Sequence, residues 1–229
     1  MPSGKKRPKI KWTTDRLQKY DDQHGLSKKA HGMVRPDYWR HGHWTEKDIM
    51  RDHGRTLAYY EPIHRLVETY SKGKLRGLRL LHIASATGIY TQFLQSRGVQ
   101  AVGLDLNNEI LGIAKAIKNR RLVHGDAQQL PFKTNSFDFV LTDNFLFSNY
   151  MAEEMPVLGE FRRVLKPDGI AILYKVYEEK FDLKEIEQQG FKLLKKAVVP
   201  SYEAGVQDLV NWLFGEQTLF YLVLKKTGR

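Results

Sequence analysis

The stretch from Arg79 to Asp105 constrains the fold of this chain more than any other. Its apolar start predicts a strand, the small residues from Ala84 to Gly88 predict a tight turn, and an amphipathic helix, Ile89–Arg97, follows. A second strand, Gln100–Leu104, then ends at the acid Asp105. Parallel βαβ units bind nucleotide-like ligands at the carboxyl ends of their strands, where small residues admit the ligand and an acid accepts hydrogen bonds from ribose hydroxyls. The sequence therefore predicts half of a nucleotide site.

The remainder of the chain alternates strand and helix patterns, which predicts an α/β fold. We expect a doubly wound, seven-stranded, mostly parallel sheet with flanking helices over residues 76–229, preceded by a basic helical N-terminal extension over residues 1–75. Pro167 and Gly169 are expected to end a helix and set a turn before the fifth strand. The further elements expected are a helix at Asn107–Lys118, strands at Arg121–His124 and Ser136–Asp143, a helix at Met155–Leu165, a strand at Ile170–Tyr174, a helix over residues 180–189, a strand at Phe191–Val199, a helix at Tyr202–Phe214 and a strand at Thr218–Lys225.

The N-terminal extension carries nearly all of the excess positive charge. Residues 1–80 contain 19 Lys and Arg against 9 Asp and Glu, whereas residues 81–229 contain 18 against 17. Such asymmetry indicates an arm attracted to anionic partners, with RNA contact through residues 1–80 as one interpretation and a solvated basic tail as the other. Residues 1–12 are expected to be flexible or to fold only on a partner.

Three helices are expected between this arm and the first strand, at Thr13–Gln23, Thr45–His53 and Thr56–Tyr70. Aromatic and basic side chains alternate over residues 31–44. That mixture is compatible with stacking on bases, with lining a substrate pocket, or with a buried lid on the main domain.

Composition excludes several classes of function. The chain has no cysteine, which excludes disulfides, thiolate metal sites and cysteine nucleophiles. His41, His43 and His53 are not completed by acids at ligand spacing, so we expect no metal. No apolar run approaches the length of a membrane span and no signal sequence is recognisable, which leads us to expect a cytoplasmic protein without a membrane partner.

Two motifs resemble those of the class I S-adenosylmethionine-dependent methyltransferases. That family usually has acid-x-Gly-x-Gly-x-Gly after the first strand; aligned on Gly88, this chain has His82, Ala84 and Ala86 at the other three positions. The second motif is a closer match, with Gly125-Asp126-Ala127 after the third strand and Leu130-Pro131-Phe132 beyond it. The junction from Phe161 to Gly169 is also typical of the family.

The resemblance implies S-adenosylmethionine as cofactor. Asp105 is expected to accept from the ribose, Asp126 from the adenine amino group, and the backbone near Asp143 to contact the cofactor. The helices before the first strand would cap the cofactor, with Tyr59, Tyr60 and His64 either contacting substrate or packing in the core. The full set of expected cofactor-binding residues is His82, Ala84, Ser85, Ala86, Gly88, Tyr90, Asp105, Leu106, Asp126, Ala127 and Asp143.

Methyl transfer is an in-line displacement that depends mainly on holding the reacting atoms in place, so no catalytic side chain is obligatory and none is assigned. The acceptor is expected to be a small anionic molecule or an RNA. The alternative is a catalytically weak or inactive relative that serves as an RNA-binding, ribonucleoprotein-binding or scaffolding module. The missing glycines favour the alternative, whereas Asp105 and the Gly125-Asp126-Ala127 triplet favour the enzyme.

Overall fold

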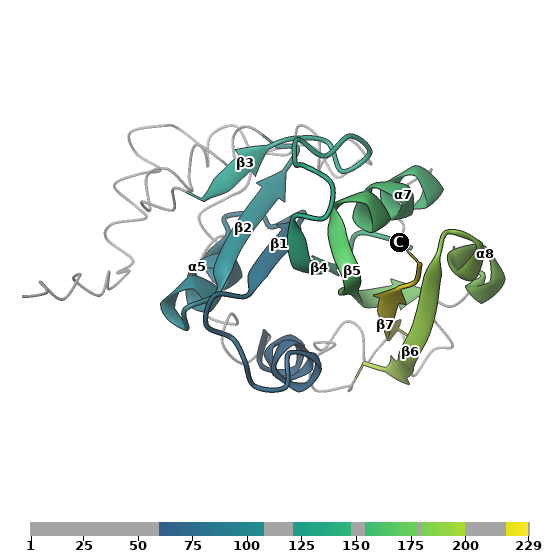
Figure 1. Cartoon of the computed structure of the whole chain (residues 1–229), viewed down its shortest axis with the longest axis horizontal. Helices are drawn as coiled ribbons and strands as arrows, with labels where there is room; N and C mark the ends of the chain where they lie inside the picture. Colours follow the sequence, from purple (N-terminus) through teal and green to yellow (C-terminus); the bar gives the residue numbers. More distant parts are fainter. Residues whose placement is uncertain (1–59, 108–120, 148–153, 178–179, 200–218, 229) are drawn as a thin grey trace, which may run out of the picture.

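The computed structural model (Figure 1) describes residues 60–107, 121–147, 154–177, 180–199 and 219–228. Several expectations lie outside these residues: the arm, the helices expected before residue 60, the histidines His41, His43 and His53, and nearly all of the helices expected at Asn107–Lys118 and Tyr202–Phe214. The described part begins with a helix over residues 60–70.

Seven strands form one sheet in the order β3-β2-β1-β4-β5-β7-β6. Only β7 is reversed, since it pairs antiparallel with both β5 and β6, while the pairs from β3 to β5 are all parallel. This confirms the expected seven-stranded, mostly parallel sheet. The strands are β1 (Arg79–Ile83), β2 (Gln100–Asp105), β3 (Leu122–His124), β4 (Phe137–Asp143), β5 (Leu165–Tyr177), β6 (Phe191–Val198) and β7 (Leu219–Lys226).

Helices cover both faces of the sheet, as Figure 1 shows, because the central strands are apolar on both faces. The helix over residues 60–70 and α5 (Ile89–Ser96) contribute Ile63, Val67 and Leu94 to one core cluster, which includes Leu80 of β1. On the other face, α7 (Glu154–Val164) and α8 (Leu183–Gln188) contribute to a second cluster, which includes the next residue, Leu81. Alternate residues of one strand therefore serve two separate cores.

The turn expected between α7 and the fifth strand is an irregular start of that strand instead. β5 begins at Leu165, directly after α7, and Leu165 pairs with Phe137 of β4. The chain still bends tightly here: Asp168 has φ 61° and a Cβ on Gly169 would lie 2.9 Å from the Lys166 carbonyl oxygen. Pairing with β4 thus extends the strand through residues whose local signals are those of a turn. The other expected strands agree with the structure to within one residue at each end.

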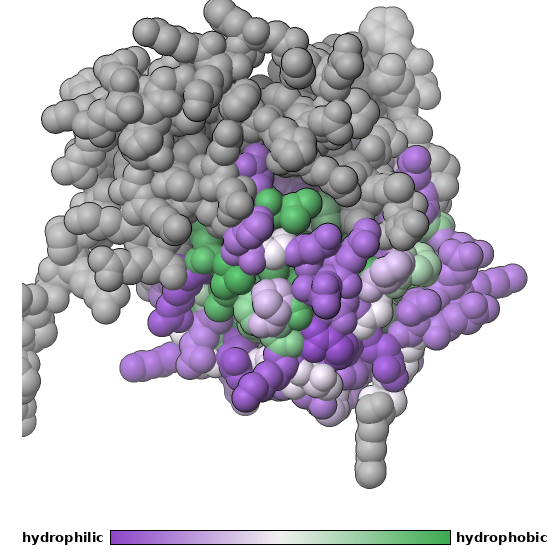
Figure 2. Space-filling view, turned by 90° about the horizontal axis from the view of Figure 1, so that it is seen from above, coloured by the Kyte–Doolittle hydropathy of each residue, from purple (hydrophilic) through white to green (hydrophobic). Residues whose placement is uncertain are grey.

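On the face shown in Figure 2, the coloured surface is mainly hydrophilic, with apolar residues gathered near the middle of the view. Three large apolar side chains are exposed among the described residues: Leu106, Leu194 and Val198. Within the same residues, no helix is both long and apolar enough to span a bilayer.

Candidate functional site

The turn after β1 keeps the backbone of a glycine-rich turn although two of its three glycine positions are occupied by alanine. Ala84, Ala86 and Gly88 all have left-handed φ angles, of 51°, 47° and 71°. A left-handed conformation costs an alanine about 1–2 kcal/mol, whereas glycine adopts it freely. Gly88 is also the N-cap of α5, so the turn leads directly into the helix. The fold therefore imposes on these alanines a backbone that their own preferences oppose.

Asp105, the last residue of β2, holds this turn in place. Its Oδ2 accepts a hydrogen bond of 2.9 Å from the backbone N–H of Ala86, and its Oδ1 accepts one of 2.9 Å from the N–H of Asn107. Burial raises the pKa of Asp105, and these backbone donors oppose that rise. Because the two carboxylate oxygens together have four lone pairs and three backbone N–H groups, of Ala86, Leu106 and Asn107, bond to them, one site remains for a ligand.

His82 occupies the position of the family's acid, and it is buried and neutral. Its Nδ1 lies 3.4 Å from Thr91 Oγ1, and its ring meets the edges of Tyr60 and Tyr90. Burial lowers the pKa of His82 to about 4, so the side chain carries no charge at neutral pH. It cannot supply the fixed negative charge of an acid at this position.

Tyr90 and Ser85 are likewise enclosed by protein. Tyr90 is almost fully buried and stacks on Tyr60 with ring centroids 4.4 Å apart; burial raises the pKa of Tyr90. Ser85 fills the space left by Gly103 of β2, where a Cβ would lie 2.5 Å from Ser85 Oγ. Gly103 was missed by the sequence reasoning, although a glycine inside a strand often marks a close approach of this kind.

The loop after β3 brings the second predicted acid beside the first. The N–H of Gly125 donates to the Asp105 carbonyl over 3.1 Å, which ties the loop to the end of β2. Asp126 is exposed, and its Oδ1 accepts from the N–H of Gln128 over 2.8 Å. Leu106 lies between the two acids in sequence and is 41% exposed, and its carbonyl accepts from His124 Nε2 over 3.0 Å. Ala127, by contrast, is buried.

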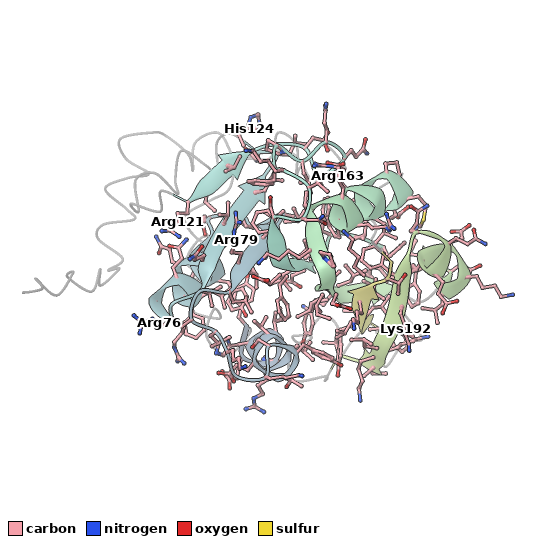
Figure 3. All side chains as sticks on the ribbon, in the orientation of Figure 1. Arg76, Arg79, Arg121, His124, Arg163 and Lys192 are labelled. Carbon is pink, nitrogen blue, oxygen red and sulfur yellow. The ribbon has the colours of Figure 1, made fainter. Side chains whose placement is uncertain are left out.

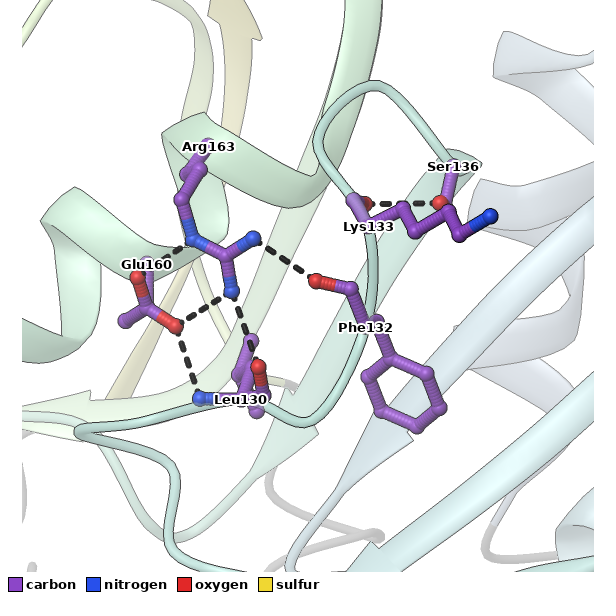
Figure 4. Close-up of polar contacts among 6 residues, drawn as sticks. All are labelled: Leu130, Phe132, Lys133, Ser136, Glu160 and Arg163. Atoms are coloured by element: carbon purple, nitrogen blue, oxygen red, sulfur yellow. Dashed lines mark hydrogen bonds and ion pairs between the residues drawn. The ribbon is translucent and has the colours of Figure 1, made fainter.

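A side-chain clamp from α7 fixes the far end of this loop (Figure 4). Arg163 donates to the carbonyl oxygens of Phe132 and Leu130 over 2.7 and 2.9 Å, and it forms two hydrogen bonds of 2.6 Å with the Glu160 carboxylate. Glu160 in turn accepts from the Leu130 N–H over 2.7 Å. Hydrogen bonding to Arg163 lowers the pKa of Glu160 and keeps it ionised. Sequence reasoning treated this junction as topological and missed its contact with the loop.

Backbone strain gathers at the same edge of the sheet, at the carboxyl ends of β1, β4 and β5. Besides the two alanines, Asn144 and Phe147 after β4 have φ angles of 48° and 54°. Lys175, buried near the end of β5 where the register with β7 shifts, has φ 55°. The expected contact residue Asp143 pairs with Tyr174 at this edge. Clustered strain of this kind is typical of functional sites.

No group of three or more His, Cys, Asp or Glu within the described ranges could hold a metal ion. The groups at this edge are two carboxylates, Asp105 and Asp126, the exposed side chain of Leu106, and a tight turn that leads into the N-terminus of α5. That combination suits a ligand with hydroxyl groups and a flat apolar ring.

Comparison with known proteins points to one family. Residues 81–173 match the family model described as "Methyltransferase domain". Demethylmenaquinone methyltransferase from Staphylococcus aureus (strain MRSA252) is 32% identical over 138 residues, which are 57% of this chain and 55% of that protein. The chain thus spans about half the length of the curated relatives that it matches.

Solved structures share the fold. The PH0226 protein from Pyrococcus horikoshii OT3 has a TM-score of 0.58 at 18% identity, covering 85% of this chain and all of that one (100%). The [4+2]-cyclase SpnF has a TM-score of 0.57 at 18% identity, covering 72% of this chain and 81% of that one. At these identities the likeness is one of fold alone.

Proposed function

We propose that the chain is a class I S-adenosylmethionine-dependent methyltransferase that transfers a methyl group from S-adenosylmethionine to an anionic acceptor, since residues 81–173 match the methyltransferase-domain model. The observation that carries the proposal is the turn after β1: three left-handed residues at alternate positions, bonded through Ala86 to the carboxylate of Asp105.

The residues at this edge fit the nucleoside half of the cofactor. Asp105 has a lone pair for a ribose hydroxyl, and the exposed Leu106 side chain offers a surface for the adenine ring. Asp126, exposed and tied to the end of β2 through Gly125, is suited to accept from the adenine amino group. The methionine half has less to bind it, because His82 is neutral and buried.

When bound, S-adenosylmethionine supplies an electrophilic methyl carbon on a sulfonium, from which an acceptor's lone pair displaces a neutral thioether in line. The protein contributes chiefly position and exclusion of water. Asp143 and Asn144, at the end of β4, are the side chains at which we place the acceptor. An acceptor that already carries a lone pair needs no general base, and we assign none.

We propose that the acceptor is a small anionic molecule or an RNA, since residues 1–80 carry 19 basic and 9 acidic residues. The two are separated by incubating the protein with methyl-labelled cofactor and a cell extract, then dividing the products by size and nuclease sensitivity. Label in nuclease-sensitive material identifies RNA; label in the small-molecule fraction identifies a metabolite.

The cofactor proposal is tested by titration calorimetry with S-adenosylmethionine and S-adenosylhomocysteine. We expect micromolar binding by the wild type and at least about tenfold weaker binding by Asp126→Ala and Asp105→Asn, because each change removes a carboxylate oxygen that accepts from the proposed ligand. Folded wild-type protein that binds neither ligand would contradict the proposal.

Asp182→Ala is a matched control for Asp126→Ala. Both residues are exposed aspartates whose Oδ1 accepts a 2.8 Å hydrogen bond from the N–H two residues later. Only Asp126 lies at the proposed cofactor edge, whereas Asp182 caps α8. Equal effects of the two substitutions on affinity would assign Asp126 a structural role only.

A second candidate function is a methyltransferase-like binding or scaffolding module without efficient catalysis. The methyl groups of Ala84 and Ala86 in the turn and the uncharged His82 favour it. A fold does not fix an activity, and one structural neighbour is named a [4+2]-cyclase. Cofactor binding without label transfer to any acceptor would support this candidate over the enzyme.

A further inference from the structure

The sequence between Glu68 and Asp105 contains basic residues but no acid. Its five Lys and Arg all lie in the linker before β1, at the first residue of β1, or directly after α5, and all five are exposed: Lys72, Lys74, Arg76, Arg79 and Arg97. These positions belong to the amino-terminal edge of the sheet, opposite the edge that holds Asp105.

Backbone contacts bring the linker and the turn after α5 together. The N–H of Gly77 donates to the Gly98 carbonyl over 3.0 Å, and the N–H of Gln100 donates to the Leu78 carbonyl over 2.7 Å. Arg121, exposed just before β3, extends the group along the same edge, since its carbonyl accepts from Gly103 of β2. Figure 3 shows Arg76, Arg79 and Arg121 on the same side of the molecule, with Lys192 on the opposite side. We call these six residues the basic edge.

Five of the six residues have no ion pair within the described part of the chain: Lys72, Lys74, Arg76, Arg79 and Arg97. The nearby carboxylate of Asp138 already accepts from the backbone N–H of Arg79 and from Lys166 Nζ. The guanidinium groups of Arg79 and Arg97 lie over the rings of Phe137 and Phe93, with 5.7 and 4.9 Å between each Cζ atom and the ring centroid.

We propose that the basic edge is a docking surface for the phosphate backbone of a single-stranded RNA. Four of its six residues are arginines, whose planar forks pair with phosphate oxygens in a bidentate manner. An anionic membrane is a poorer fit, because the exposed large apolar residues of the described part, Leu106, Leu194 and Val198, lie outside this edge. Binding to such a surface is driven by counterion release and therefore depends steeply on salt.

The surface is independent of the proposed methyl transfer. β1 has five residues, so the Cα atoms at its two ends are about 13 Å apart at the usual rise per residue. A strand held at the basic edge therefore does not compete with a ligand at Asp105, and cofactor binding serves as a separate readout in the same protein.

The test is fluorescence anisotropy of a labelled oligouridylate against the full-length protein over a series of salt concentrations. One variant combines Lys72→Gln, Lys74→Gln, Arg76→Gln and Arg97→Gln. The matched control removes the same charge elsewhere, with Lys180→Gln, Lys184→Gln, Lys192→Gln and Lys195→Gln, all exposed. Thermal melting and S-adenosylmethionine titration establish that both variants are folded and that the cofactor site is unchanged.

We expect the basic-edge variant to bind the RNA about tenfold more weakly or worse at about 0.1 M salt, and its slope of log Kd against log salt to fall by about 3. The control should change affinity less than about twofold. Equal losses in both variants, no RNA binding by the wild type, or a salt slope that the basic-edge variant retains would each overturn the proposal. Equally tight, edge-dependent binding to vesicles of anionic lipid would also overturn it.

Discussion

The two loops at the carboxyl edge of the sheet reach a fixed shape by different means. The turn after β1 holds Ala84 and Ala86 in left-handed conformations, with one carboxylate, Asp105, bonded to its backbone. The loop after β3 has no left-handed residue between Gly125 and Phe132, and the Arg163 and Glu160 side chains hold it in place. The first loop is strained and supported from β2, whereas the second is relaxed and clamped from α7. Substitutions should therefore act on them in opposite ways.

Acid should weaken the support beneath the first loop, with the largest effect that we expect. His82 has a pKa of about 4 when folded and about 6.5 when unfolded, so the unfolded chain takes up its proton first as the pH falls. The neutral ring makes its full contribution to the free energy of unfolding above pH 6.5. This contribution decreases as the pH falls from 6.5 to 4. The free energy of unfolding should fall by about 2 kcal/mol at pH 5 and about 3 kcal/mol at pH 4 from this group.

Urea unfolding of the wild type and His82→Phe at several pH values isolates this contribution. Phenylalanine retains an aromatic ring beside Tyr60 and Tyr90 but does not titrate. As the pH falls from 6.5 to 4, the wild type should lose more unfolding free energy than His82→Phe does. A difference that stays constant from pH 7 to pH 4 would show that His82 is not held neutral by burial.

Removing the clamp should release the second loop. Arg163→Ala leaves the carbonyl oxygens of Leu130 and Phe132 without their donor and Glu160 without its cation. We expect unfolding free energy to fall by about 2–3 kcal/mol, measured by urea denaturation, and Arg163→Lys to recover only part of it because lysine lacks the planar fork. Arg65→Ala is the control, since its pair with Glu61 is exposed and should matter little. Equal losses for Arg163→Ala and Arg65→Ala would contradict the clamp.

Sequence patterns predicted the seven-stranded, mostly parallel sheet because the length and spacing of its strands follow from local periodicity along the chain. They did not predict the clamp, since Arg163 lies 31 and 33 residues from the carbonyls that it contacts and no local pattern records that pairing. They also placed a turn where β5 begins, because Pro167 and Gly169 are strong local signals, whereas pairing of Leu165 with Phe137 is a tertiary effect.

The first turn shows a subtler limit. By sequence alone, alanine at the two glycine positions 84 and 86 indicates that the motif is lost. Ala84 and Ala86 nevertheless keep the left-handed backbone conformation. The retention depends on the hydrogen bond from Ala86 to Asp105 and on the room that Gly103 leaves for Ser85, neither of which is visible in the turn's own sequence. Cofactor binding by Asp105 and Asp126 stays a prediction.

Replacing Gly103 or Gly125 by alanine should show how tightly the first turn and the loop after β3 are packed. At Gly103, a Cβ would lie 2.2 Å from Leu122 Cδ2 and 2.5 Å from Ser85 Oγ, so Gly103→Ala should displace the first turn and lower unfolding free energy by about 2 kcal/mol. At Gly125 the nearest atoms, of Leu104 and Pro131, are 3.0 and 3.3 Å away, and Gly125→Ala should lower it by about 1 kcal/mol or less. Thermal melts and chemical denaturation measure both; the reverse order would contradict the packing described.

Replacing alanine by glycine should change the free energy of unfolding least. The change should be an increase in the turn after β1 and a decrease in the loop after β3. Ala84→Gly and Ala86→Gly relieve about 1–2 kcal/mol of left-handed strain each, which exceeds the entropy that glycine loses on folding, so each should raise unfolding free energy by about 0.5–1 kcal/mol. Ala127→Gly is the matched control in the second loop: it is buried, has no positive φ, and should lower stability by a similar amount. Chemical denaturation of the three variants gives the sign directly. A loss of stability in Ala84→Gly and Ala86→Gly would mean that the alanine methyl groups make packing contacts worth more than the strain, and that the first turn is adapted to alanine.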